Sequence, residues 1–228
     1  MKETIVVCGH GPGISDAVAR KFGKEGHPVA IVARSADRLS AAARAISETG
    51  VKVQAFPCDL GDPEAVRAMI RAAREALGPI GVIHYNAYGG GAGDITQAPA
   101  SELRGVFDIA VTGLVTAVQE ALPDLRSTKG SVLVTGGGFA FYDAKIDAMA
   151  GHFNAMGLAI GKAAQHKTVG LLNQKLSADG IYVGEVVVLG MVKGTAFDNG
   201  QATLEASAIA DKFWALAQAR KDVTVNFG

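Results

Sequence analysis

Seven short apolar runs alternate with segments of helical length along this chain. Each run has five to nine residues and is rich in Val and Ile, which is typical of strands buried on both faces. A helix between successive strands implies crossover connections and therefore a parallel sheet. We expect an α/β fold with a doubly wound, seven-stranded parallel sheet and helices on both faces. The expected strands are residues 3–8, 28–33, 52–56, 81–86, 131–135, 181–189 and 223–227.

Length and composition limit the class of protein. A chain of 228 residues can bury a full core as one unit, so we expect one domain over residues 1–228. Lys plus Arg and Asp plus Glu number 22 each, so no net charge favours nucleic acid or an anionic membrane as a partner. No stretch approaches the ~20 consecutive apolar residues of a membrane span. We therefore expect a small-molecule partner, no nucleic acid and no membrane.

The amino terminus and the two cysteines bear on the cellular location of the protein. The first apolar run is too short for the core of a signal peptide. Cys8 and Cys58 each lie at the end of an apolar run, where a small buried thiol fits. We therefore expect reduced core thiols, no metal site and a cytoplasmic location.

Several helices have clear sequence signals. Asp62, Pro63 and Glu64 open a segment that runs to Leu77, since they supply an N-cap, a first-turn proline and an early carboxylate. Two longer helices are expected at 101–125 and 156–178, and their small residues favour packing across a two-fold axis in a homodimer or homotetramer.

The least regular segments are 87–99, 136–153 and 191–203. All three follow expected strands, at the edge where open α/β sheets bind their ligands. We therefore expect the functional site among these segments.

A glycine-rich turn follows the first strand and opens a helix that runs to about residue 25. Gly9 permits a tight turn, and Gly13 lets backbone N–H groups approach a pyrophosphate at the positive end of the helix. At the first strand–helix junction this pattern predicts a Rossmann fold that binds NAD(P). The expected contact residues here are Gly9, His10, Gly11, Gly13 and Ile14.

The turn resembles that of the short-chain dehydrogenase/reductase family, whose pattern is Thr-Gly-x-x-x-Gly-x-Gly. Cys8 replaces the Thr and Ser15 replaces the last Gly. The resemblance continues over the whole chain, through Arg34, Cys58-Asp59-Leu60, Tyr85-Asn86-Ala87-Tyr88 and Gly161-Lys162-Ala163-Ala164.

The resemblance implies further cofactor contacts. Arg34 ends the second strand where NAD-preferring relatives carry an acid, and a guanidinium can clamp a 2′-phosphate, so we favour NADP over NAD. The alternative is that Arg34 is simply solvated. By resemblance the adenosine half contacts Asp59, Leu60, Asn86 and Ala87, and the carboxamide contacts Thr195. Taken singly, each of these four residues is more often a turn former or a core residue.

The catalytic positions depart from the family. The resemblance implies hydride transfer at a carbonyl or alcohol carbon, with Tyr as acid or base, a Ser, a Lys and a relay Asn. Lys162 matches the Lys and also the cofactor ribose contact. Leu158 stands at the Tyr position, Gly137 at the Ser position and Ala110 at the Asn position.

A substitute acid is available nearby in the sequence. Tyr142 and His152 lie in the longer segment between Gly137 and Leu158, and either could replace the missing proton donor. The alternative is that the aromatic residues there are the packing of a lid. Tyr88, at a usual Gly position, could crowd the cofactor or donate a proton.

Three functions remain open. The first is an NADP(H)-dependent oxidoreductase that acts on an unknown carbonyl or alcohol with non-standard catalytic residues. The second is a catalytically inactive NAD(P)-binding sensor or assembly protein. The third is a lyase or isomerase without net hydride transfer, for which no residue argues directly.

Overall fold

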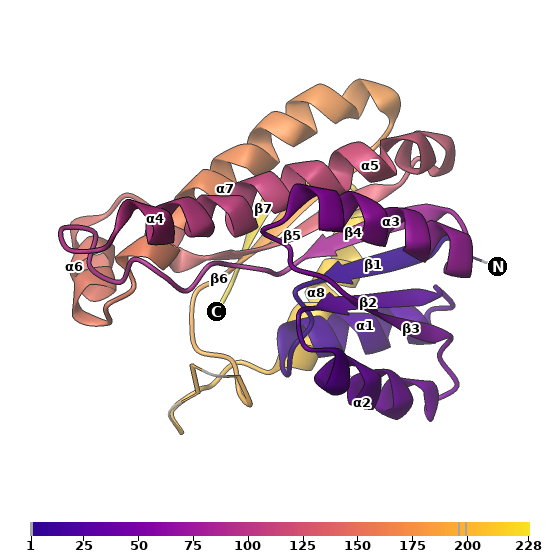
Figure 1. Cartoon of the computed structure of the whole chain (residues 1–228), viewed down its shortest axis with the longest axis horizontal. Coiled ribbons are helices and arrows are strands. Elements are labelled where there is room, and N and C mark those ends of the chain that lie inside the picture. The colour runs from indigo at the N-terminus through magenta and orange to yellow at the C-terminus, as the bar shows by residue number, and fades with distance from the viewer. Residues whose placement is uncertain (1, 196, 199) are drawn as a thin grey trace.

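A seven-stranded sheet runs through the middle of the molecule in the order β3-β2-β1-β4-β5-β6-β7 (Figure 1). The computed structural model describes residues 2–195, 197–198 and 200–228. Every neighbouring pair of strands is parallel, which confirms the expected fold class. The order reverses between β1 and β4, and such a switch point is where open sheets bind nucleotides. The strands are β1 (Thr4–Cys8), β2 (Val29–Ala33), β3 (Val53–Pro57), β4 (Ile80–Tyr85), β5 (Ser131–Gly137), β6 (Tyr182–Val188) and β7 (Thr224–Phe227).

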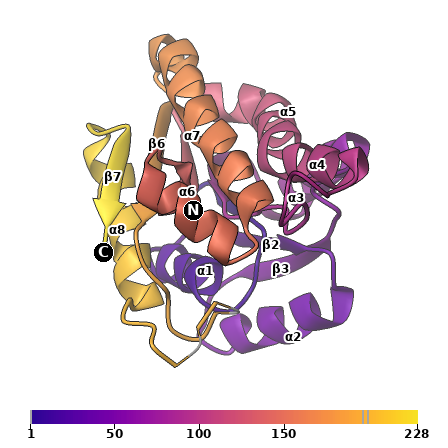
Figure 2. The ribbon, with the colours of Figure 1, turned by 90° about the vertical axis from the view of Figure 1, so that its left-hand side faces the viewer.

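Helices cover both faces of the sheet, as expected (Figures 1 and 2). One face packs against α3, α5 and α7, and the other packs against α1, α2 and α8. The helices are α1 (Ile14–Lys24), α2 (Ala36–Ser47), α3 (Pro63–Leu77), α4 (Ala100–Phe107), α5 (Gly113–Thr128), α6 (Ala144–His152), α7 (Met156–Leu176) and α8 (Ala206–Ala219).

Side chains of each central strand divide between two apolar cores. Val6 and Cys8 of β1 join the core under α3 and α5, while Ile5 and Val7 join the core over α1 and α8. This double burial explains why the strands read as continuous apolar runs instead of alternating ones. Both cysteines are free and buried, as the sequence predicts.

Helix α6 was not expected. The sequence predicts an irregular segment over 136–153, but residues 144–152 form a helix beside α7. Its N-cap is Asp143, whose side chain accepts hydrogen bonds from the backbone N–H groups of Lys145 (2.8 Å) and Ile146 (3.3 Å). Among its described residues Ala150 is the buried one, so the helix lacks the broad apolar stripe by which sequence patterns are recognised.

A π-helical turn, Asp108–Thr112, joins α4 to α5. The Tyr85 hydroxyl donates a 2.5 Å hydrogen bond to the carbonyl of Ile109 within this turn. Gly113 follows, and a Cβ there would lie 2.2 Å from the carbonyl oxygen of Leu60. The expected helix over 101–125 therefore contains a π-helical turn where it approaches the sheet, and such turns often occur at functional sites.

The helical segment Ala100–Thr128 is long and apolar. By length and composition alone it could cross a membrane, since an 18-residue window has a mean hydropathy of 1.4. Counting uninterrupted apolar residues missed this segment, because polar residues break the run. Its position against α3, α7 and β4 is that of a core helix.

Acid stability should depend on His84. This side chain is fully buried in β4, with Nε2 3.1 Å from Thr135 Oγ1, and burial lowers its pKa to about 3. An unfolded histidine titrates near ~6.5, so unfolding takes up a proton as the pH falls from 6.5 towards 3, and stability falls in that window. In urea denaturation at pH 7 and pH 4.5, wild-type protein should lose more unfolding free energy than His84→Leu. Equal losses would contradict this role.

Candidate cofactor and active site

Two glycines of the turn after β1 have positive φ angles and neighbours so close that a Cβ would clash with them. Gly9 has a φ of +84°, and a Cβ there would lie 2.7 Å from the backbone nitrogen of Ala87. Gly13 has a φ of +96°, and a Cβ there would lie 2.5 Å from Thr195 Cγ2. Gly11 has open space around it. The turn is therefore pressed between the end of β4 and the segment after β6.

The turn ends in an uncapped helix. Gly13 is the N-cap of α1 and offers no side-chain hydrogen bond, whereas Ser35 and Asp62 cap α2 and α3. The Ser15 hydroxyl accepts from the N–H of Gly11 (2.9 Å) and donates to its carbonyl (3.2 Å), so this departure from the family pattern closes the turn. First-turn amides without a side-chain cap favour a bound anion.

A pocket of about 440 Å³ lies beside this turn. The glycine-rich turn forms one side, the start of α2 forms another, and Gly194 contributes from the segment after β6. Arg34 and Arg38 are both exposed, but only Arg38 is among the described residues that line the pocket. Sequence reasoning missed Arg38, although its position one helical turn after Arg34 is a readable signal. The lining residues are His10, Gly11, Pro12, Gly13, Asp16, Ala33, Ser35, Arg38, Leu39, Ala42 and Gly194.

His10 lies against the first turn of α1. Its side chain is 6% exposed, and Nε2 lies 3.5 Å from Asp16 Oδ1. Burial raises the pKa of Asp16, but hydrogen bonds with His10 and Arg20 outweigh burial, so the net pKa is below its usual value. The pocket thus holds an ionised carboxylate that is paired with the guanidinium of Arg20.

The four residues expected at the adenosine half divide into two pairs. Asp59 Oδ1 accepts from the N–H of Gly61 (3.0 Å), and Leu60 is buried in the core, so the structure gives both the roles of turn former and core residue. Asn86 and Ala87 lie beside the glycine turn, where the Asn86 amide donates to the carbonyl of Gly9 (3.5 Å). The adenosine contacts of all four stay predictions.

Lys162 is buried on α7 with a fixed ammonium group. Its Nζ donates to the carbonyl of Thr135 (2.7 Å) and to Gln165 Oε1 (2.9 Å). The same nitrogen lies 6.0 Å from the ring centre of Tyr88. Burial lowers the pKa of Lys162 to about 8, while the carboxylate of Glu185 acts in the opposite direction.

The three positions where the sequence predicts replaced catalytic residues lie near Lys162 or its partner Gln165. Leu158 is half-buried one helical turn before it, and a Cβ on Gly137 would lie 3.9 Å from Lys162 Cγ. Ala110 is buried in the π-helical turn, where its carbonyl accepts from Gln165 Nε2 (3.0 Å). A serine at position 137 would therefore fit beside Lys162, whereas Gly137 supplies no hydroxyl group there.

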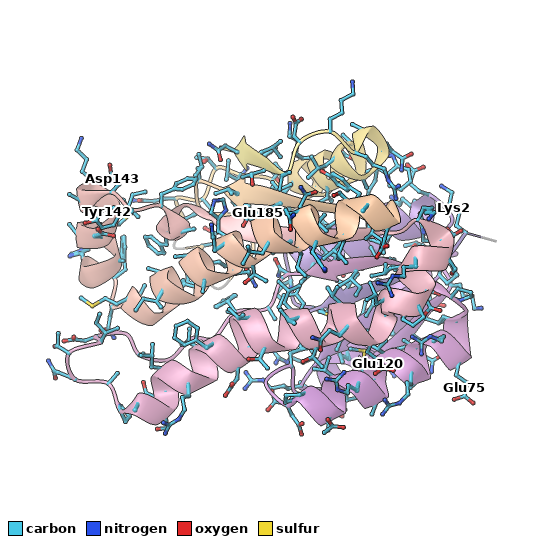
Figure 3. The ribbon with its side chains drawn as sticks, turned by 90° about the horizontal axis from the view of Figure 1, so that it is seen from above. Lys2, Glu75, Glu120, Tyr142, Asp143 and Glu185 are labelled. Carbon is cyan, nitrogen blue, oxygen red and sulfur yellow. The ribbon has the colours of Figure 1, made fainter. Side chains whose placement is uncertain are left out.

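Tyr142 and His152 lie elsewhere. The Tyr142 side chain is fully exposed at the end of the molecule beside α6, and Figure 3 shows it well separated from Glu185 near α7. His152 is exposed and packs edge-on against Phe153, with ring centres 5.1 Å apart. Among the described residues, Lys162 has a contact with Tyr88 but none with Tyr142 or His152. Their roles as substitute acids stay predictions, and the geometry favours Tyr88.

The segment after β6 folds over the site. Thr195 lies against Gly13 and donates to the carbonyl of Val192 (2.8 Å), while the ring of Phe197 lies 5.9 Å from that of Tyr88. Residues 196 and 199 of the irregular segment 191–203 lie outside the described residues.

Comparison with known families identifies this arrangement. A family model described as short chain dehydrogenase matches residues 3–204. The chain belongs to the short chain dehydrogenase family.

Curated relatives match parts of the chain. Meso-2,3-butanediol dehydrogenase of Serratia marcescens is 29% identical over 167 residues, which cover 70% of this chain and 66% of the relative. The 3-dehydrosphinganine reductase TSC10B of Arabidopsis thaliana is 31% identical over 127 residues, which cover 55% of this chain and 37% of the relative. The matches thus span between about a third and two thirds of these relatives' lengths.

Solved structures support the fold over nearly the whole chain. A short chain dehydrogenase from Burkholderia cenocepacia in complex with NADP superposes with a TM-score of 0.84 at 23% identity, covering 99% of this chain and 96% of that one. A short-chain dehydrogenase/reductase of Caenorhabditis elegans with cofactor gives 0.83 at 20% identity, covering 98% and 93%. At these identities the likeness concerns the fold alone.

Alanine should destabilise the protein at Gly9, where a Cβ would clash, but not at Gly11, where there is space for one. Gly9→Ala should destabilise the protein by about 1–3 kcal/mol, because of the positive φ and the clash with Ala87. Gly11→Ala is the matched control and should change stability by less than about 0.5 kcal/mol. Urea denaturation measures both, and a Gly9→Ala protein as stable as wild type would contradict the geometry.

Lys162 should leave a signature in alkaline solution. Its folded pKa of about 8 lies below the unfolded value of 10.5, so the unfolded state binds the extra proton and the Lys162 contribution to stability rises between pH 8 and pH 10.5. The burial penalty on the charge is fully present below pH 8. Between pH 7 and pH 9.5 the unfolding free energy of wild type should therefore rise relative to that of Lys162→Met. A difference independent of pH would contradict the burial of a charged ammonium.

Proposed function

We propose that this chain is an NADP(H)-dependent oxidoreductase that moves hydride between the nicotinamide and a carbonyl or alcohol carbon of a small molecule. The observation that carries the proposal is the glycine turn at the switch point of the sheet. A Cβ on Gly9 would clash with Ala87 and a Cβ on Gly13 would clash with Thr195, so the turn needs glycine at both positions. Lys162 lies at the same edge of the sheet. A bound nicotinamide nucleotide supplies or accepts the hydride there.

The phosphate preference is supported by two guanidinium groups. Arg38 lines the pocket, and Arg34 follows β2 four residues earlier, where an acid would repel a 2′-phosphate. The described residues of the pocket include one carboxylate, Asp16, and it is already bonded to Arg20. Similar folds solved with NADP or NADPH are consistent with the same choice.

Proton transfer is assigned to Tyr88. Its side chain is 39% exposed in the segment after β4, and its ring centre lies 6.0 Å from Lys162 Nζ. Burial raises the pKa of Tyr88, so the hydroxyl is protonated near neutral pH and can donate when a carbonyl is reduced. Leu158 has no proton to give. Tyr142 and His152 remain the alternative donors.

A second candidate function is nucleotide binding without turnover. Two of the three Lys162 N–H groups are already committed to Thr135 and Gln165, and the position that carries the family's tyrosine is Leu158. A sensor or assembly protein needs the cofactor pocket but no proton donor. The predicted cytoplasmic location, single domain and homodimer or homotetramer are compatible with either function and stay predictions.

Cofactor choice can be measured by the fluorescence of the reduced nicotinamide. NADPH should bind more tightly than NADH, and Arg38→Gln should weaken NADPH about 10-fold while changing NADH little, because a charge-assisted contact is lost. Arg44→Gln, on the exposed last turn of α2, is the matched control. Equal affinities of wild-type protein for the two nucleotides would rule out the phosphate assignment.

Turnover decides between the two functions. Wild-type protein with NADPH and a panel of aldehydes and ketones should oxidise the cofactor, and Tyr88→Phe should lower the rate at least ~100-fold with NADPH affinity intact. Tyr142→Phe is the control for an exposed phenol. Tight NADPH binding with no turnover on any substrate would favour the second function.

A further inference from the structure

Gln165 occupies the space beneath Lys162. Its side chain lies on α7, one turn after Lys162, and is 0% exposed. The amide oxygen accepts from Lys162 Nζ (2.9 Å). The amide nitrogen donates to the carbonyls of Ala110 (3.0 Å) and Ala87 (3.5 Å). Both ends of one buried amide are therefore engaged.

These partners come from the three elements that build the site. Ala110 lies in the π-helical turn, Ala87 follows β4 and packs against Gly9, and Lys162 belongs to α7. Only one orientation of the amide satisfies them, since the oxygen must face the ammonium and the NH₂ group must face two carbonyls. If the amide were flipped, its NH₂ group would face the Lys162 ammonium and its oxygen would face two carbonyl oxygens, which is costly in a buried site.

We infer that Gln165 is a positioning residue that holds the Lys162 ammonium for the nicotinamide half of the cofactor. The inference rests on the proposed function. An ammonium has three N–H groups, and with two directed to Thr135 and Gln165 the third has a defined direction. Held in this way, Lys162 contacts the ribose hydroxyls without first being ordered, which lowers the entropic cost of binding.

The same geometry limits proton movement. Gln165 bonds the carbonyl of Ala110, at the position where the resemblance places the relay Asn. An amide neither gains nor loses a proton near neutral pH, so Gln165 holds Lys162 but does not carry a proton away from it.

Two ligands test the positioning role. NADPH contains the nicotinamide ribose, and adenosine 2′,5′-bisphosphate lacks it but keeps the adenosine half. In Gln165→Met, which removes the acceptor at similar length, the Kd of NADPH should rise about 10-fold and that of the bisphosphate should stay within about 2-fold. Lys162→Met should give the same pattern. The double variant should bind NADPH no more weakly than Lys162→Met, because both changes remove one interaction.

A second variant keeps the test decisive if Gln165→Met does not fold. Gln165→Glu retains an oxygen facing Lys162 and adds a charge, so the pKa of Lys162, read from the pH dependence of NADPH affinity, should rise relative to wild type. An unmoved pH profile would overturn the inference, as would equal weakening of both ligands in Gln165→Met or additivity with Lys162→Met. Wild-type protein that binds no NADPH would instead overturn the proposed function and the inference with it.

Discussion

The close approach of the glycine turn to the end of β4 determines the rest of the site. A Cβ on Gly9 would lie 2.7 Å from the Ala87 nitrogen, so no other residue keeps the two strand ends at this distance without a shift of backbone. β1 and β4 are neighbours at the point where the strand order reverses. The backbone N–H groups at the start of α1 and the segment after β4 therefore meet at one edge, which is the geometry that a dinucleotide needs.

Ala87 also links this edge to the buried polar cluster. Its carbonyl accepts from Gln165, which in turn accepts from Lys162. The segment after β4, the π-helical turn and α7 are thus joined by hydrogen bonds between buried groups, and such bonds are costly to break. These bonds give the Lys162 ammonium a defined position.

The sequence predicts most of the fold. All seven strands lie where the apolar runs predict them, because burial on both faces leaves a strong pattern. Helix α6 was missed because its apolar side is narrow. For the candidate site, local motifs single out Gly9, Gly13 and Lys162, and their cofactor roles stay predictions. Arg38 and Gln165 were missed, since their roles come from helix geometry and from partners 55 or more residues away in the case of Ala110 and Ala87.

A nicotinamide nucleotide bound against the turn between β1 and α1 should protect the backbone amides of that turn. Hydrogen–deuterium exchange in residues 9–16, measured with and without NADPH, follows these amides. Exchange in this segment should slow when NADPH is added, while exchange at β7 on the far edge of the sheet stays the same. Unchanged exchange in residues 9–16 at saturating NADPH would show that the nucleotide does not bind there.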